Sequence, residues 1–182
     1  MVSPNQAPAS VTLSFEQVGP DVVATYSGSW SSWTESQVTN LETLRIQSVS
    51  FEALGGREVG VWQGATVVKD SGTEWTNEFT VADSFSGDAF GFVLPFAFIS
   101  GLLYAPPNYT VGDTIEGSLT FNSTDIVALG FTPGDSGSFS SDGGTINYTV
   151  GAIPEPSSYG FLLGAVGLAT AIFCRRRRAR TD

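Results

Sequence analysis

The side chains most often used for nucleophilic and metal chemistry are almost absent from this chain of 182 residues. It contains no histidine and one cysteine, Cys174. A serine or cysteine nucleophile therefore has no imidazole to activate it, and zinc or haem has no histidine ligand. A single cysteine also cannot form an internal disulfide bond. The groups left for chemistry are carboxylates and tryptophans.

The carboxylates are the commonest ionisable groups, with 18 Asp and Glu residues against 8 Lys and Arg residues. Loop acids such as Asp135 and Asp142 could bind Ca²⁺, but the chain has no Asp-x-Asp-x-Asp-Gly spacing. Two carboxylates can also hydrolyse a glycoside, and no pair stands out among the acids. We therefore expect no metal, no cofactor and no catalytic residue. A carboxylate-based glycoside hydrolase is the less favoured alternative.

Two of the four tryptophans, Trp30 and Trp33, lie in the polar segment Ser-Gly-Ser-Trp-Ser-Ser-Trp, for which we expect an exposed loop. Exposed aromatic rings can stack on sugars, so these two residues are the candidate sugar-stacking pair of a carbohydrate-binding β-sandwich module. The alternative, which we favour, is that both rings pack against the core and are partly buried.

Acidic residues are spread over the body of the sequence, whereas most basic residues lie at its C-terminal end. The whole chain has a formal net charge of −10. Residues 1–153 contain three basic and sixteen acidic residues, which gives −13, whereas five of the eight basic residues lie in residues 175–182. An acidic body argues against nucleic acid as a partner, because binding to it rests on neutralising phosphates.

An uncharged apolar run, residues 159–174, separates the acidic body from the basic end. As a helix, these sixteen residues would be about 24 Å long, slightly less than the roughly 30 Å hydrocarbon core of a bilayer. A buried core helix is the alternative, but four arginines follow directly, and a helix that docks into a core seldom ends in four charges. We predict a single transmembrane helix at 159–174 that contacts membrane lipid, with residues 175–182 as a cytoplasmic tail.

The segment before this helix, residues 153–158, contains Pro154-Glu155-Pro156. Two prolines around one residue disfavour helix and central strand and favour an extended, exposed linker. The ordered set of Pro-Glu-Pro-Ser, a short apolar helix and an arginine cluster resembles the PEP-CTERM protein-sorting domain over about residues 153–178.

This resemblance implies a protein exported from a bacterium that has an outer membrane. Its partner would be an exosortase, a membrane enzyme that recognises Pro154, Glu155 and Pro156. The chain would stay in the inner membrane transiently, with its body in the periplasm, and would then move to the cell surface or the exopolysaccharide matrix. The residues of the stop-transfer signal would be Arg175, Arg176, Arg177 and Arg178.

Export also requires an N-terminal signal, and residues 1–9 show neither a basic region nor an apolar region. Ala7-Pro8-Ala9 nevertheless has the A-x-A pattern of a signal-peptide cleavage site. We interpret residues 1–9 as a disordered terminus with two alternative origins. It is either a signal-peptide remnant whose beginning is encoded upstream or an ordinary terminus.

The body, residues 10–152, shows the alternation of apolar and polar residues that is typical of strands. Residues 11–15, 115–121 and 146–150 follow this pattern, and 90–99 is apolar on both faces, as in a central strand. Asp142-Gly143 predicts a hairpin turn, and 36–48 is the one stretch in which we expect a helical turn. Frequent turn residues favour an all-β, antiparallel β-sandwich or jelly-roll-like domain of roughly eight to ten strands.

Overall fold

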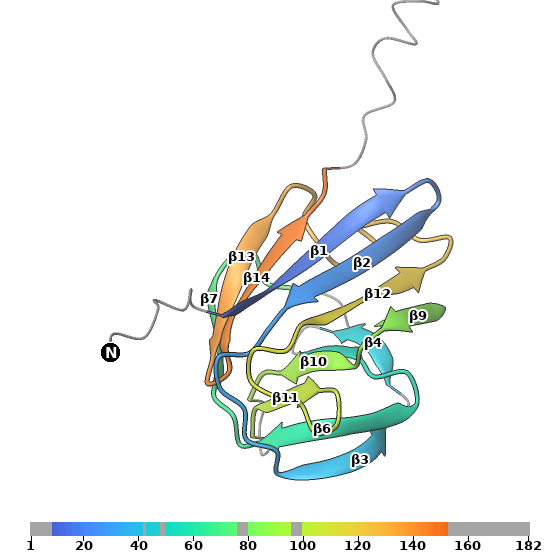
Figure 1. The fold of residues 1–182 in the computed structure, drawn as a ribbon. Helices are drawn as coiled ribbons and strands as arrows, with labels where there is room; N and C mark the ends of the chain where they lie inside the picture. Colours follow the sequence, from blue (N-terminus) through green and yellow to red (C-terminus); the bar gives the residue numbers. More distant parts are fainter. Residues whose placement is uncertain (1–8, 42, 48–49, 76–79, 96–99, 153–182) are drawn as a thin grey trace, which may run out of the picture. The chain divides into compact units, whose positions relative to one another are not determined.

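The structure is a computed structural model that describes residues 9–41, 43–47, 50–75, 80–95 and 100–152. The chain divides into two units, Met1–Ala152 and Ile153–Asp182. All of the described residues belong to the first unit, which we call the body. Its strands form two seven-stranded sheets (Figure 1).

The first sheet, sheet A, has the strand order β7-β13-β14-β1-β2-β12-β9. Its strands are mostly antiparallel, but β1 and β14 run parallel, with Val11 opposite Ile146 and Phe15 opposite Val150. The bounds are β1 Ser10–Val18, β2 Asp21–Gly28, β7 Val67–Ser71, β9 Ser84–Gly87, β12 Ile115–Phe121, β13 Ser136–Ser141 and β14 Gly144–Val150.

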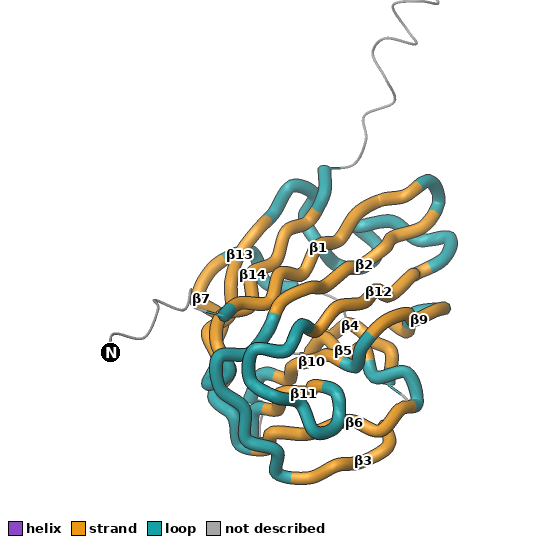
Figure 2. Tube along the Cα trace, viewed as in Figure 1, coloured by secondary structure: helices purple, strands orange, loops and turns teal. Residues whose placement is uncertain are grey.

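The second sheet, sheet B, has the order β3-β6-β11-β10-β5-β4-β8 and is antiparallel throughout its described pairs. Figure 2 shows the strands of the two sheets and the described loops between them. The bounds are β3 Gln37–Leu41, β4 Leu44–Gln47, β5 Ser50–Ala53, β6 Arg57–Gln63, β8 Thr80–Val81, β10 Phe90–Val93 and β11 Leu102–Ala105.

Alternating hydrophobicity decides which face of each strand is buried. On β1, Val11, Leu13 and Phe15 are fully buried, whereas Thr12 and Glu16 between and beyond them are exposed. The period of two places every second side chain on the same face, so one face of the strand meets the core and the other meets water.

Aromatic rings from both sheets meet in the core. Phe15 of sheet A lies 6.2 Å from Phe51 of sheet B, measured between ring centroids, and Phe139 lies 4.9 Å from Phe92. Tyr26 of sheet A stacks on Phe90 of sheet B, with 4.9 Å between the ring centroids. The two sheets are therefore packed through their inner faces as a β-sandwich, and aromatic side chains supply much of the buried area.

The predicted all-β class is confirmed, and two details of the prediction change. The described residues form fourteen strands rather than eight to ten, because several strands are only two to five residues long. The helical turn expected at 36–48 is wrong: β3 and β4 form there instead, since backbone pairing with β6 and β5 outweighs local preference.

No helix long and apolar enough to cross a membrane occurs among the residues that the structure describes. The transmembrane helix predicted at 159–174 lies outside those residues, as do the linker 153–158 and the tail 175–182.

Replacing Phe51 with alanine tests the aromatic core. Phe51 is fully buried and contacts rings from both sheets. We expect Phe51→Ala to lower the free energy of unfolding by about 3–5 kcal/mol. Thr12→Ala, on the exposed face of β1, should change it by less than about 0.5 kcal/mol. Urea unfolding of a fragment that ends at Ala152 measures both, and equal effects would contradict the proposed packing.

Candidate functional site

Asp135 and Asp142, the two acids considered for calcium, hold neighbouring segments of backbone in place. The Asp142 carboxylate accepts the Thr66 N–H at 2.6 Å. The Asp135 carboxylate accepts the Thr73 N–H at 2.9 Å and the Tyr148 hydroxyl at 3.1 Å. Each acid therefore ties the start or the end of β7 to the β13–β14 hairpin, and its oxygens serve the fold.

The same arrangement recurs at other loops. A carboxylate oxygen accepts a backbone N–H in each of the pairs Asp21–Ser123, Asp83–Asn122, Asp88–Glu116, Asp125–Ala128 and Glu35–Asn108. Hydrogen bonds to a charged acceptor are stronger than neutral ones. Here they satisfy the N–H groups of four loop residues and of Glu116, which lies at the start of β12. Within the described part of the chain, no three metal-ligating side chains gather into one group.

Glu52, the most buried carboxylate among the described residues, is paired with a base. It is 2% exposed and lies on the face of sheet B that points away from the core of the sandwich. Both Nε and Nη2 of Arg45 approach its Oε1, at 2.8 and 2.7 Å. Burial, and then the nearby Glu52, raise the pKa of Tyr104 on the same face. Because Glu52 is covered and paired, it is not available to a substrate.

The structure agrees with the favoured alternative for the tryptophan pair, in which both rings pack against the core instead of stacking on a sugar. Trp30 is 0% exposed, and its ring lies 5.7 Å from that of Phe90 in the core. Its backbone N–H donates to the Tyr109 hydroxyl at 2.9 Å, and the next residue, Ser31, donates its N–H to Gly143 O at 2.8 Å. These bonds hold the segment against the β13–β14 turn, and the ring of Trp30 points into the core. Because neither face of the ring is exposed, a sugar cannot stack on it.

Trp33, the other member of the predicted pair, is half-buried. It makes edge contacts with Trp62 at 6.1 Å and with Tyr109 at 5.8 Å, so these aromatic rings lie across one another rather than in one plane. The three residues come from segments far apart in the sequence, and no spacing rule would have grouped them. Their geometry is that of rings packed at the margin of the core.

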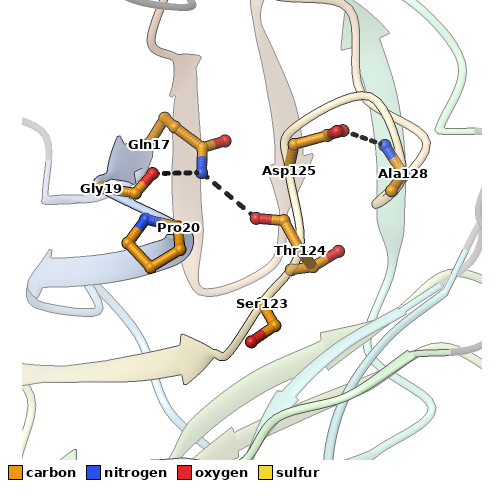
Figure 3. Close-up of a pocket in the computed structure, with 7 residues that line it drawn as sticks. All are labelled: Gln17, Gly19, Pro20, Ser123, Thr124, Asp125 and Ala128. Carbon is orange, nitrogen blue, oxygen red and sulfur yellow. Dashed lines mark hydrogen bonds between the residues drawn. The ribbon is translucent and has the colours of Figure 1, made fainter.

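A shallow hollow of about 540 Å³ lies at the end of sheet A where β1 turns into β2 (Figure 3). Its polar groups are bonded within the protein: Gln17 Nε2 donates to Gly19 O and Thr124 O, and its Oε1 accepts the Ile126 N–H. The lining residues are Gln17, Gly19, Pro20, Ser123, Thr124, Asp125 and Ala128. The single carboxylate among them, Asp125, has no second acid beside it in the lining with which to perform acid–base chemistry.

The body ends beside this hollow. Gly151, directly after β14, donates its N–H to Phe15 O at 2.7 Å, two residues before Gln17 on β1. The fold therefore brings the C-terminal end of β14 to the same end of sheet A as the turn between β1 and β2.

The residues of the predicted sorting signal follow the body. The recognition element Pro154, Glu155 and Pro156 begins three positions after Gly151 and lies outside the described part of the chain. The predicted stop-transfer residues also lie outside it, so their role stays a prediction that the structure does not test. These residues are Arg175, Arg176, Arg177 and Arg178.

Asp135 gives a test of the structural role of the acids. Burial raises its pKa, but hydrogen bonds from Thr73, Ser136 and Tyr148 outweigh burial, so the pKa is lowered overall. Burial and the hydrogen bond to Asp135 raise the pKa of Tyr148 to about 12. A lowered carboxyl pKa adds stability above the unfolded pKa of about 3.9, and that stability is lost as the pH falls through the folded value.

We therefore expect Asp135→Asn to destabilise the body at pH 7 by about 1 kcal/mol, allowing for solvent screening, and by less near pH 3. Urea unfolding at the two pH values measures the difference. Glu58→Gln, an exposed control on β6, should have little effect at either pH. A loss that is the same at pH 3 and pH 7 would contradict a role for the ionised carboxylate.

Comparison with known proteins locates the functional signal outside these sites. Residues 152–178 match the family model described as the PEP-CTERM protein-sorting motif. No curated protein and no solved structure matches the chain. The match spans the Pro-Glu-Pro element, the apolar run and all four consecutive arginines, and it begins one residue after Gly151. The chain therefore carries a PEP-CTERM protein-sorting motif at residues 152–178, directly after its folded body.

Proposed function

We propose that this is an exported protein that an exosortase processes in the inner membrane and that then reaches the cell surface or the exopolysaccharide matrix. The observation that carries the proposal is the match of residues 152–178 to the PEP-CTERM protein-sorting motif. The position of the match supports it, because the motif begins directly after β14 and Gly151, with which the described strands and their hydrogen bonds to β1 finish.

The residues of the motif have separate physical roles in this proposal. Pro154 and Pro156 lack a backbone N–H, which keeps the element extended and open to the cleft of an enzyme. The apolar run 159–174 spans the bilayer, helped by arginine side chains that reach toward the interface. Arg175–Arg178 stay in the cytoplasm by the positive-inside rule, which leaves the acidic body in the periplasm.

The body, in this proposal, is a non-catalytic and metal-free structural domain. Several of its described acids accept backbone N–H groups, as Asp135 and Asp142 do, and the buried Glu52 is paired with Arg45. Neither arrangement supports the glycoside hydrolase alternative. With Trp30 in the core, the sugar-stacking alternative has lost one of its two rings.

The outward face of sheet A carries exposed hydroxyl and amide side chains, which suit contact with a hydrated polymer. On this face, Thr12 of β1 lies between Ser27 of β2 and Asn147 of β14. Two residues further along β1, Thr25 of β2 and Thr149 of β14 lie on either side of the strand. All five side chains are exposed. Hydroxyl and amide groups exchange hydrogen bonds between water and sugar at little net cost. We therefore infer weak, distributed contact with exopolysaccharide, without a binding pocket.

Changing the Pro-Glu-Pro element tests processing. In cells that contain an exosortase, the surface-located chain should lack the apolar run and the arginines. Replacing Pro154, Glu155 and Pro156 with alanine should leave the anchor intact, so unprocessed chain should collect in the inner membrane. Mass spectrometry of the surface and membrane fractions measures both. A surface fraction dominated by chains that keep Arg175–Arg178 would refute processing and leave a simple membrane tether.

Removing the arginines separates anchoring from recognition. Without Arg175–Arg178 the short apolar run loses its cytoplasmic stop, so retention and orientation should fail while the recognition element stays intact. In an export-competent chain, a reporter active only in the periplasm should be active when it is fused after residue 152. Activity from a cytoplasm-only reporter at the same position would contradict the proposed orientation.

A further inference from the structure

Two segments lie at the end of the sandwich where β14 finishes, the turn Val18–Asp21 and the loop Asn122–Asp135. We call these two segments the tail-proximal end. These segments are joined to one another and to β14. Asp21 accepts the Ser123 N–H at 2.9 Å, and Gly134 donates its N–H to Val150 O at 3.1 Å. Because β1 and β14 run parallel, both strands finish at this end (Figure 1).

The tether from this end to the sorting element is short. Gly151 is fixed to β1 through its bond to Phe15 O. Three residue steps separate it from Pro154, and a fully extended chain covers at most about 11 Å in three steps. An enzyme that holds Pro154-Glu155-Pro156 in its cleft therefore works close to the tail-proximal end, with Pro154 at most about 11 Å from Gly151, unless the end of β14 first detaches.

The chemistry of the tail-proximal end suits a protein surface better than a lipid surface. Val18 and Val127 are 54% and 56% exposed there. The hollow lined by Pro20 and Ala128 lies between the two segments (Figure 3). Neither segment contains a lysine or an arginine, so this end offers no cation to anionic lipid headgroups. Apolar side chains around a hollow are instead a common feature of protein contacts.

We propose that the tail-proximal end, with Val127 and the adjacent hollow, is the surface on which the processing enzyme docks while it holds the Pro-Glu-Pro element. This inference rests on the proposed function, since it requires an exosortase to act on the chain. The tether holds the two surfaces at high effective concentration, so even a weak contact affects how often the element enters the cleft.

A matched pair of valine variants tests this proposal in the full-length, membrane-anchored chain. Val127→Glu places a charge at the tail-proximal end. Val111→Glu is the control, because Val111 is 48% exposed in a loop whose Gly112 N–H binds Trp30 O, beyond the opposite end of β2. We expect Val127→Glu to slow processing by about fivefold or more, and Val111→Glu by less than about twofold. The fraction of processed chain over time, read by mass spectrometry, is the measurement.

A flexible spacer of glycine and serine between Ala152 and Ile153 separates docking from misfolding. With the spacer, the enzyme can hold Pro154–Pro156 away from the body, so Val127→Glu should be processed at the same rate as its spacer-containing parent. Equal rates for Val127→Glu and Val111→Glu without the spacer would overturn the proposal. A slow Val127→Glu that the spacer does not rescue would overturn it too, since that result indicates a folding defect.

Two further outcomes are distinguishable from these. If Val127→Glu weakens membrane retention in cells that lack an exosortase, the end contacts lipid and the docking proposal is wrong. If the unaltered chain is never processed in cells that contain the enzyme, the proposed function itself fails. In that case the docking proposal fails with it, and the valine variants have no processing rate to change.

Discussion

The parallel pairing of β1 with β14 is the constraint on which the rest of the body depends. β14 fills the position between β13 and β1, so sheet A is continuous only when the last strand of the body is in place. The pairing sets the register of Phe15 and Tyr148, whose rings enter the core. Without it, β7 and β13 would be separated from the other strands of sheet A. The last described strand therefore ends at Val150, and the sorting motif begins at residue 152.

The acidity of the body follows from how its loops are held. A β-sandwich with many short connections leaves backbone N–H groups outside its ladders, and each needs an acceptor. Asp21, Asp83 and Asp125 supply one to the loop that follows β12, and Asp88 supplies one to Glu116 within β12. At these positions a carboxylate acts as the acceptor of a backbone N–H and needs no lysine or arginine beside it. A large negative charge in this protein is therefore a structural property, and it does not by itself indicate a ligand site.

Local patterns in the sequence predicted the elements that depend on local contacts. Alternation located β1 and β14, and Asp142-Gly143 predicted the turn between Ser141 and Gly144. Long-range contacts were beyond such patterns. The parallel register of β1 joins residues more than 130 positions apart, and Trp30 is buried because neighbouring backbone bonds to Gly143 and Tyr109. The structural roles of Asp135 and Asp142 depend on partners more than 60 residues away. The sorting motif was readable because its residues are contiguous.

Under the proposed function, the sorting motif and the folded body differ in charge, and this difference has an electrostatic consequence. Residues 1–153 carry a formal charge of −13, and the arginines at 175–178 carry the opposite sign. While the tail is attached, the apolar run and the arginines hold the acidic body within a short tether of an anionic bilayer. Under the same proposal, removal of the tail would leave the body without its anchor, and its net negative charge would disfavour a return to anionic lipid within a Debye length of about 10 Å. Processing would then do more than remove an anchor, because close approach of the released acidic body to anionic lipid would also be unfavourable.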